Sequence, residues 1–138
     1  MVFTIFSFNP WWNYYFCNIK KKDIIFDNSY AYVSFDSYPV SKFHSLIFPK
    51  RHIENFFELN DNELLACNDL INKIKNKVQA DDKTIKGFNI GSNLGKVAGQ
   101  SIMHCHIHLI PRREGDVDNP QGGVRAVIPA KQHYTRKK

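Results

Sequence analysis

A strict alternation of side-chain types runs along residues 103–109. The three histidines His104, His106 and His108 occupy every second position, and the residues between them are apolar or weakly polar. Period-2 alternation predicts a strand with one face in a core and the other carrying all three imidazoles. Successive imidazoles would lie roughly 6.6 to 6.8 Å apart along such a strand. One phosphate-sized group could therefore contact two of them.

Other runs along the chain carry the signals of strands and helices. Asn60 and Glu63 form a capping-box-like start, and apolar residues then follow at helical spacing, which predicts the main helix over residues 61–79. A shorter helix is expected over 53–59. Short runs rich in β-branched and aromatic residues predict further strands over 24–26, 30–35, 45–48, 85–90 and 124–128.

The composition indicates one globular domain with an anionic partner. The chain has 138 residues, of which 43% are hydrophobic, which suffices for one core but not for two. Its formal net charge is +6, and the basic residues lie in short, scattered groups. We expect a nucleotide or a phosphate as partner. No zinc-finger spacing or continuous basic helix indicates a dedicated nucleic-acid-binding module.

The cysteines and the two ends of the chain bear on where the protein works. Three widely separated cysteines argue against a disulfide framework, so we expect cytoplasmic localisation. The first seventeen residues carry no charge, but they lack a basic start and are interrupted by Asn9 and Pro10. We predict an aromatic N-terminal arm over 1–22, packed on the domain or a second subunit, with peripheral membrane contact as the alternative. No transmembrane segment is expected, and residues 114–138 form a polar C-terminal segment.

Three uses of the histidine run remain open from the residues alone. It could hold a metal, perform nucleophilic or acid–base catalysis, or form a structural set of polar residues; catalysis is favoured because no further ligand motif accompanies the histidines. Residues 91–101 precede the run and contain three glycines. Such a loop can turn its backbone N–H groups toward an anion, although many hairpins have similar sequences.

The sequence resembles the histidine-triad (HIT) family of nucleotide hydrolases and transferases. Residues 104–110 resemble the family motif His-φ-His-φ-His-φ-φ, in which φ is hydrophobic, and residues 98–101 and 43–52 resemble its flanking blocks. The similarity extends from about Ile24 to Arg113. It implies an α+β fold with a five-stranded antiparallel sheet, one long and one short helix, in a single domain over 1–138 that forms a homodimer.

The resemblance also implies roles for individual residues. The middle histidine, His106, would be the nucleophile that attacks the α-phosphorus of a nucleotide, supported by a backbone carbonyl of His104. His108 would contact the phosphate, with charge-assisted hydrogen bonds when it is protonated, and His44 would pack behind the triad. The remaining substrate-binding positions would be Asp36 and Ser37 at the ribose, Asn93 at the phosphate or ribose, and Gly99, Gln100 and Ser101 at the phosphate.

The expected reaction is hydrolysis of a dinucleoside polyphosphate, such as diadenosine tetraphosphate, with release of a nucleoside monophosphate. Hydrolysis of a nucleoside phosphoramidate, as by an adenosine 5′-monophosphoramidase, is the alternative within the family. A nucleotide-binding or interaction protein with incidental catalysis is the alternative from another class. No cofactor is required, although a divalent cation could accompany the nucleotide.

Two departures from the family pattern affect these expectations. Phe43 replaces the usual glycine before His44, and we expect it either to crowd the nucleoside pocket or to reshape the turn. Some family members hold a structural zinc through a Cys-x-x-Cys pair and two histidines at the positions of His52 and His104. Here Cys17 matches the second cysteine, but Tyr14 stands at the first, so no zinc is predicted.

Overall fold

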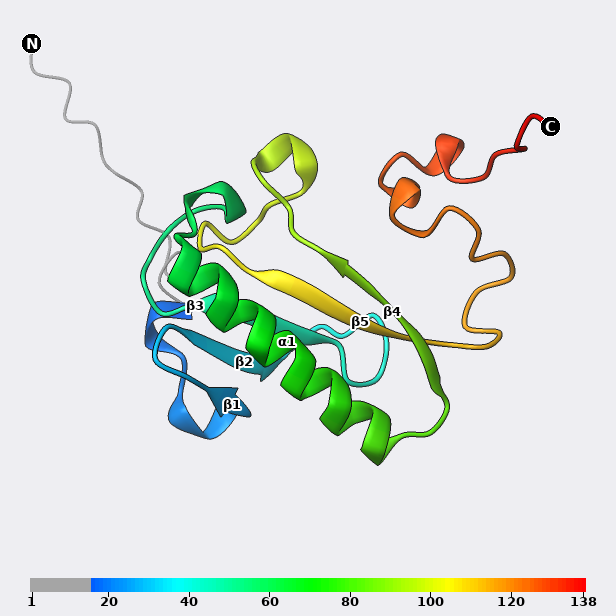
Figure 1. Ribbon diagram of the computed structural model, residues 1–138. Coiled ribbons are helices and arrows are strands. Elements are labelled where there is room, and N and C mark those ends of the chain that lie inside the picture. Colours follow the sequence, from blue (N-terminus) through cyan, green and yellow to red (C-terminus); the bar gives the residue numbers. More distant parts are fainter. Residues whose placement is uncertain (1–15) are drawn as a thin grey trace, which may run out of the picture.

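Five antiparallel strands form the sheet of the protein in the order β1-β2-β3-β5-β4 (Figure 1). The computed structural model describes residues 16–138, so most of the predicted N-terminal arm lies outside the described residues. The fold is α+β, and the predicted five-stranded antiparallel sheet is confirmed. The strands are β1 (Phe26–Asp27), β2 (Ala31–Phe35), β3 (Ser45–Pro49), β4 (Ile85–Gly91) and β5 (Ile107–Arg113).

One long helix, α1 (Asp61–Asp81), covers one face of this sheet. Its start is the predicted capping box: the Asn60 side chain accepts the Glu63 N–H, and the Glu63 side chain accepts the Asn60 N–H. Its buried stripe packs on β2 and β3, because the side chains recur at helical spacing on one side. The buried apolar members of this stripe are Ala66, Cys67, Leu70, Ile74 and Val78.

The histidine run enters the sheet later than predicted. β5 begins at Ile107, so His108 lies in the strand while His104 and His106 lie in the segment that precedes it. The strand is interrupted because the Cys105 N–H donates to the carbonyl of Ile53 at 2.7 Å instead of to a neighbouring strand. The prediction of one strand over 103–109 with three imidazoles on a single face is therefore wrong.

Two other predicted elements take a tighter form. The helix expected over 53–59 is reduced to a 3₁₀ turn, η4 (Phe56–Glu58), capped by Asn55. The strand expected over 124–128 is also wrong, since those residues form the 3₁₀ helix η6 (Gly123–Val127). Gly122 has a φ of 89°, which starts a tight turn, and local bonds such as Arg125 N–H to the Gly122 carbonyl replace strand pairing.

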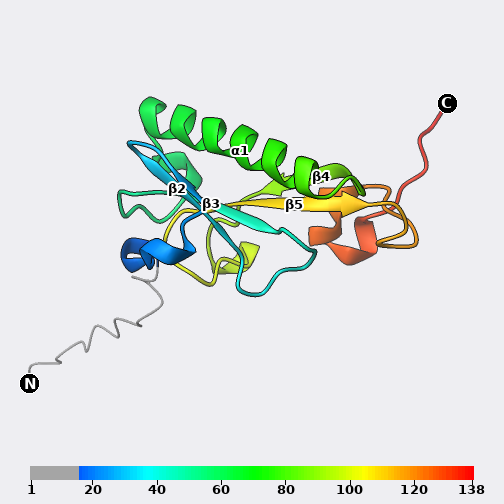
Figure 2. The same ribbon diagram turned by 90° about the horizontal axis from the view of Figure 1, so that it is seen from below.

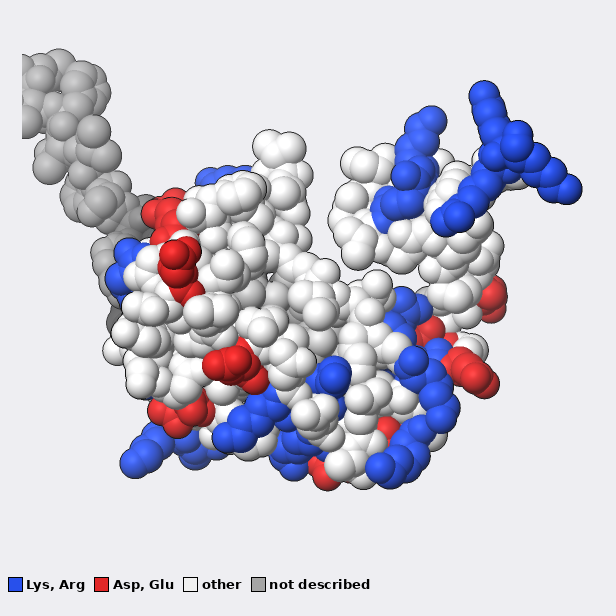
Figure 3. Space-filling view, in the orientation of Figure 1, with Lys and Arg blue, Asp and Glu red and all other residues white. Residues whose placement is uncertain are grey.

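The face of the sheet opposite α1 carries the loops (Figure 2). The turns after residue 16, the glycine-rich connection over 92–106 and the 3₁₀ helices of the C-terminal segment lie on this side of the sheet. Lys and Arg side chains lie in separate groups with acidic residues between them, including a group on the C-terminal segment (Figure 3). Among residues 16–138, no helix is long and apolar enough to span a membrane.

Candidate active site

The ring of His106 has the orientation that a histidine nucleophile needs. Its Nδ1 lies 2.7 Å from the carbonyl oxygen of His104. Because a carbonyl oxygen can only accept, Nδ1 carries the proton and Nε2 keeps its lone pair. Burial lowers the pKa of His106, so the ring is neutral near pH 7. The sequence prediction that His106 presents a neutral imidazole, supported by the His104 backbone, agrees with this geometry.

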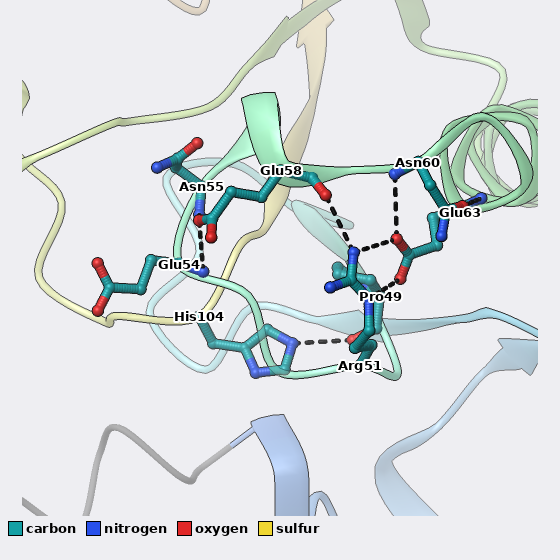
Figure 4. Close-up of polar contacts among 8 residues, drawn as sticks. All are labelled: Pro49, Arg51, Glu54, Asn55, Glu58, Asn60, Glu63 and His104. Carbon is teal, nitrogen blue, oxygen red and sulfur yellow. Dashed lines mark hydrogen bonds and ion pairs between the residues drawn. The ribbon is translucent and has the colours of Figure 1, made fainter.

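His104 is fully buried and held from both ends of its ring. Its Nε2–H donates to the carbonyl of Pro49 at 2.8 Å (Figure 4), which leaves the lone pair on Nδ1. Burial lowers the pKa of this imidazole as well. The Nδ1 atom lies 3.1 Å from Nδ1 of His52 and 3.5 Å from Sγ of Cys17. The His104 backbone therefore orients the His106 ring, while the His104 side chain contacts His52 and Cys17.

His44 and His108 form a chain of hydrogen bonds whose direction the backbone sets. The Val40 N–H donates to Nδ1 of His44 at 3.2 Å, so His44 carries its own proton on Nε2. That Nε2–H donates to Nδ1 of His108 at 2.9 Å, and His108 is left with its N–H at Nε2. The motif resemblance placed His44 behind the triad, which is where it lies. The contribution of the Val40 backbone has no sequence signal, because any residue but proline supplies an N–H.

His108 is a neutral donor in this structure. Burial, with smaller contributions from the neighbouring His106 and His44, lowers its pKa to about 4 despite the opposing charge of Asp36. Protonation at neutral pH would place a cation in a partly buried position, and the nearby Asp36 carboxylate offsets this cost only in part. The charge-assisted hydrogen bonds expected when His108 is protonated therefore remain a prediction. A bound phosphate would meet a neutral N–H donor first.

Asp36 lies beside this histidine pair. One carboxylate oxygen accepts the Tyr38 N–H at 2.8 Å, and the other lies 3.6 Å from Nε2 of His44. Its negative charge acts against the effect of burial on the His44 pKa. Ser37 follows on the surface. Asp36 is therefore part of the electrostatic surroundings of the histidines. The sequence predicted a role for Asp36 at the ribose but not this effect on the histidines.

The glycine-rich loop is held by one buried side chain. Gln100 accepts the Gly95 N–H at 2.8 Å and donates to the carbonyls of Glu54 at 2.7 Å and Ile102 at 3.1 Å. Positive φ values at Gly95 and Gly99, 82° and 91°, let the chain turn tightly between these bonds. The predicted phosphate-binding loop thus has a fixed shape, and the Gln100 side chain fixes it.

Three residues predicted to contact the substrate, Asn93, Gly99 and Ser101, belong to this loop. Gly99 and Ser101 are exposed, and the side-chain nitrogen of Asn93 lies 4.0 Å from the position that a Cβ on Gly99 would take. The Ser92 hydroxyl donates to the carbonyl of His106 at 2.7 Å and so connects the start of the loop to the His106 backbone. Ser92 was not among the predicted residues, since a serine in a loop carries no specific signal.

A salt bridge connects Arg51, which follows β3, to Glu63 at the start of α1 (Figure 4). Arg51 donates to both carboxylate oxygens of Glu63, at 3.0 and 2.7 Å. The hydrogen bond from Arg51 lowers the pKa of Glu63, whose side chain is 3% exposed. Arg51 also donates to the Glu58 carbonyl at 3.0 Å. These bonds fix the segment whose Pro49 carbonyl holds His104.

Three possible metal ligands meet at the far side of His104. Sγ of Cys17 lies 3.1 Å from Nδ1 of His52, and these atoms and Nδ1 of His104 all lie within 4.8 Å of one another. One thiolate and two imidazoles are a donor set typical of zinc, and the bond from His104 to Pro49 fixes its tautomer as ligating histidines require. The residues present fit a zinc ion, while Tyr14 lies outside the described residues. The sequence-based expectation of no zinc remains a prediction.

Phe43 occupies a left-handed turn before His44. Its φ of 71° lies in the left-handed region that favours glycine, and it is the one non-glycine residue with positive φ in the described part of the chain. Its ring lies 5.6 Å from that of Phe35 between centroids, and it packs against the core beneath α1. It does not line the cavity beside His44 and His108. The structure shows neither of the two effects expected from the sequence: Phe43 does not line this cavity, and its backbone has a conformation that suits the glycine of the family pattern.

Comparison with known sequences identifies the family. The HIT domain matches residues 18–115. An uncharacterised HIT-like protein of Methanocaldococcus jannaschii is 40% identical over 106 residues, covering 73% of this chain and 80% of that protein. Adenosine 5′-monophosphoramidase HNT1 of Saccharomyces cerevisiae is 30% identical over 103 residues, covering 72% of this chain and 62% of that protein. The chain belongs to the HIT family, as its motifs predict.

Solved structures share the same fold. A hypothetical histidine triad nucleotide-binding protein from Sulfolobus tokodaii has a TM-score of 0.66 and 31% identity, covering 72% of this chain and 69% of that chain. The diadenosine triphosphate hydrolase of Plasmodium falciparum has a TM-score of 0.64 and 27% identity, covering 73% of this chain and 68% of that chain. Among the relatives, one by sequence is thus named an adenosine 5′-monophosphoramidase and one by structure a diadenosine triphosphate hydrolase.

Proposed function

We propose that this protein is a nucleotide hydrolase that uses His106 to attack the α-phosphorus of its substrate. One observation carries the proposal: the hydrogen bond from Nδ1 of His106 to the His104 carbonyl directs the lone pair to Nε2. Burial favours the neutral ring. A neutral, oriented imidazole is the form that acts as a nucleophile. Membership of the HIT family supports the same chemistry.

The reaction proceeds in two displacements. Nε2 of His106 forms a bond to the α-phosphorus, and the bond to the leaving group breaks, with its electron pair and one proton going to the leaving group. Water then attacks the phosphorus, the bond to His106 breaks, and a nucleoside monophosphate departs. Water gives up a proton in this second step, which balances the one taken up in the first. Splitting one displacement into two is the general advantage of covalent catalysis.

The surrounding residues bind the substrate in this proposal. The N–H of His108 donates to a phosphoryl oxygen, and backbone groups of Gly99 and Gln100 and the hydroxyl of Ser101 stabilise the charge that develops there. Asn93 contributes from the start of the loop. Asp36 accepts the ribose hydroxyls, with Ser37 beside it. Support comes from the fixed loop and from the clustering of Asp36, His44 and His108, whose ligating atoms all lie within 4.8 Å of one another.

Two substrate classes fit this chemistry. Dinucleoside polyphosphates such as diadenosine tetraphosphate are the class expected from the motifs, and a relative by structure is named a diadenosine triphosphate hydrolase. Nucleoside phosphoramidates are the second candidate, because two relatives by sequence are named adenosine 5′-monophosphoramidases. A nucleotide-binding protein with incidental catalysis is the non-enzymatic alternative. We further propose that the protein is a cytoplasmic homodimer, as the family resemblance implies.

A zinc ion is also compatible with the chain, through Cys17, His52 and His104. Such an ion would link the N-terminal turn at Cys17 to the segment after β3 and would hold the His104 ring in place. No step of the proposed reaction passes through it, because the Nδ1 of His104 faces away from the bond between its carbonyl and His106.

Trapping the covalent intermediate tests the proposal. The protein is mixed briefly with diadenosine tetraphosphate or adenosine phosphoramidate, quenched, and analysed by peptide mass spectrometry. We expect an added adenylyl group on His106 and none on its variant His106→Ala. His133→Ala is the matched control, because His133 is exposed in the C-terminal segment. Adenylylation of another residue, or full hydrolysis by His106→Ala, would overturn the mechanism, whereas nucleotide binding without turnover would favour the binding-protein alternative.

A further inference from the structure

One side chain connects the loop between β2 and β3 to the strand that carries His108. The loop spans residues 36–44 and is shown in cyan beside β5 in Figure 1. Near its end, the hydroxyl of Ser41 donates to the carbonyl of Pro111 in β5 at 2.7 Å. Pro111 is fully buried, and a buried carbonyl is costly to leave without a donor. This hydrogen bond therefore holds the loop against the strand.

The pairing of β3 with β5 explains why a side chain makes this contact. The two strands pair as far as Ser45 and Leu109. Continuing the same register by two residues would place Phe43 opposite Pro111. The chain leaves the register at this point, because the φ of 71° at Phe43 lies outside the extended region of a strand. The Ser41 hydroxyl thus reaches a carbonyl of β5 beyond the end of the pairing.

A second hydrogen bond between this loop and β5 is longer. Arg113 donates to the carbonyl of Lys42 at 3.3 Å, and the same nitrogen donates to the carboxylate of Asp82 at 2.8 Å. The Nε of Arg113 donates to the hydroxyl of Thr84 at 3.1 Å. Arg113 is therefore oriented mainly by the residues between α1 and β4. Of these two bonds from the loop to β5, the one from Ser41 has the better geometry.

The backbone around Ser41 connects the same position to His44. The His44 N–H donates to the Ser41 carbonyl at 3.0 Å, which closes a β-turn with a positive φ at its third residue, Phe43. The residue before Ser41 is Val40, whose N–H donates to Nδ1 of His44 at 3.2 Å. Ser41 thus lies between β5 and the N–H that sets the His44 tautomer. A movement of Ser41 away from β5 would also move that N–H.

The hydrogen bond between His44 and His108 has two possible directions. With the Val40 N–H in place, Nε2–H of His44 donates to Nδ1 of His108, and His108 carries its N–H at Nε2. Without that N–H, His44 can carry its proton on Nδ1, and its Nε2 then accepts from Nδ1–H of His108. Nε2 of His108 would then present a lone pair, which repels a phosphoryl oxygen. The Asp36 carboxylate favours the first direction, but at 3.6 Å from Nε2 of His44 it makes no hydrogen bond.

We infer that Ser41 is a positioning residue: its bond to Pro111 holds the Val40 N–H on His44 and so keeps the N–H of His108 directed at the substrate phosphate. The inference rests on the proposed function and adds to it a side chain that acts through other residues. The two arrangements of the histidine pair carry the same number of protons. Ser41 therefore affects phosphate binding through the direction of a hydrogen bond and not through charge.

Ser41→Ala and Ser41→Thr test this inference, because threonine keeps the hydroxyl and alanine removes it. Ser41 borders a cavity of about 490 Å³, which leaves room for the added methyl group. Long-range proton–nitrogen NMR spectra of the unliganded protein report which imidazole nitrogen carries each proton. We expect protons on Nε2 of His44 and His108 in the wild type and in Ser41→Thr. In Ser41→Ala we expect a second population with protons on Nδ1 of both rings.

Three further measurements accompany the spectra. Amide exchange at Val40 should be about three- to tenfold faster in Ser41→Ala. The Kd for adenosine monophosphate, measured by calorimetry, should rise about three- to tenfold in Ser41→Ala and stay near the wild-type value in Ser41→Thr. The His106 signals should not change, because that ring bonds to the carbonyl of His104. Ser29→Ala is the matched control, since Ser29 is exposed in the turn between β1 and β2.

The outcomes separate this inference from the proposed function. Unchanged tautomers of His44 and His108 in Ser41→Ala overturn the inference and leave the proposed hydrolase intact. A changed His106 tautomer in the same variant also counts against it, because the effect of Ser41 would then be general. Altered tautomers with an unchanged Kd for adenosine monophosphate overturn the connection to the phosphate. Absence of turnover and of any His106 adduct in the wild type overturns the proposed function, whereas the spectra still decide whether Ser41 sets the tautomers.

Discussion

Replacing Phe43 by glycine and by alanine separates backbone strain from packing. Both variants remove the contact with Phe35 and the core beneath α1, so both are less stable than the wild type. They differ at the backbone, because the φ of 71° suits glycine and strains alanine. The left-handed conformation costs an L-residue roughly 1 to 2 kcal/mol. Glycine in turn costs about 0.4 to 1 kcal/mol more than alanine through the entropy of the unfolded chain.

The balance of these terms predicts an unusual order of stability. We expect Phe43→Gly to be more stable than Phe43→Ala by about 0.5 to 1 kcal/mol, since the strain exceeds the entropy difference. Urea unfolding with linear extrapolation measures both free energies. The same pair of substitutions at Lys42, whose φ is not positive, is the control and should favour alanine. Alanine more stable than glycine at position 43 would refute the assignment of strain to this turn.

Four further predictions concern the site and its supports. His106→Ala should lower the turnover of the nucleotide substrate by about 1,000-fold or more, measured in the steady state, and near-normal activity would exclude this nucleophile. Because no zinc is predicted, zinc added to the metal-free protein should leave the midpoint of thermal unfolding unchanged, and a rise that Cys17→Ser abolishes would show instead that an ion binds at this cysteine. Glu63→Gln should lower the free energy of unfolding by about 1 to 3 kcal/mol near pH 7. The pKa of Glu63 is lower in the folded state than in the unfolded chain, where it is about 4.3. The stabilisation by ionised Glu63 is therefore present above the unfolded pKa and is lost as the pH falls through the folded value. The urea midpoints of Glu63→Gln and the wild type should accordingly converge in acid. Gln100→Ala should speed hydrogen exchange at the loop amides and raise the KM, and unchanged exchange would show that the loop holds its shape without this side chain.

Sequence patterns predicted the parts of the fold that local signals determine. The capping box at Asn60 and the helical spacing after it located α1 within two residues at its end. The alternation at residues 103–109 correctly predicted a strand at its end, but β5 begins only at Ile107. The N–H of Cys105 pairs with Ile53, a contact between segments 52 residues apart in sequence, and no local pattern reports it.

The sequence predicted which residues form the candidate site but not how their side chains are oriented. The motifs identified His44, His106 and His108, whereas the protonated nitrogen of each ring follows from partners such as the Val40 N–H. The family resemblance named the positions of Cys17 and His52 together, but the 35 residues between them carry no ligand spacing from which their contact could be predicted without it. These features depend on tertiary distances, which composition and periodicity do not contain.

The two faces of β5 have different surroundings: one packs in the core and the other borders the cavity beside His44 and His108. Ile107 and Leu109 contribute to stability through the core, while Ile110 borders the cavity and is half-buried. Exchanges at Ile110 or in η6 therefore cost little folding free energy compared with exchanges at Leu109. Substitutions can therefore accumulate on the cavity side of this strand, while the core side, on which the packing of the sheet against α1 depends, stays the same.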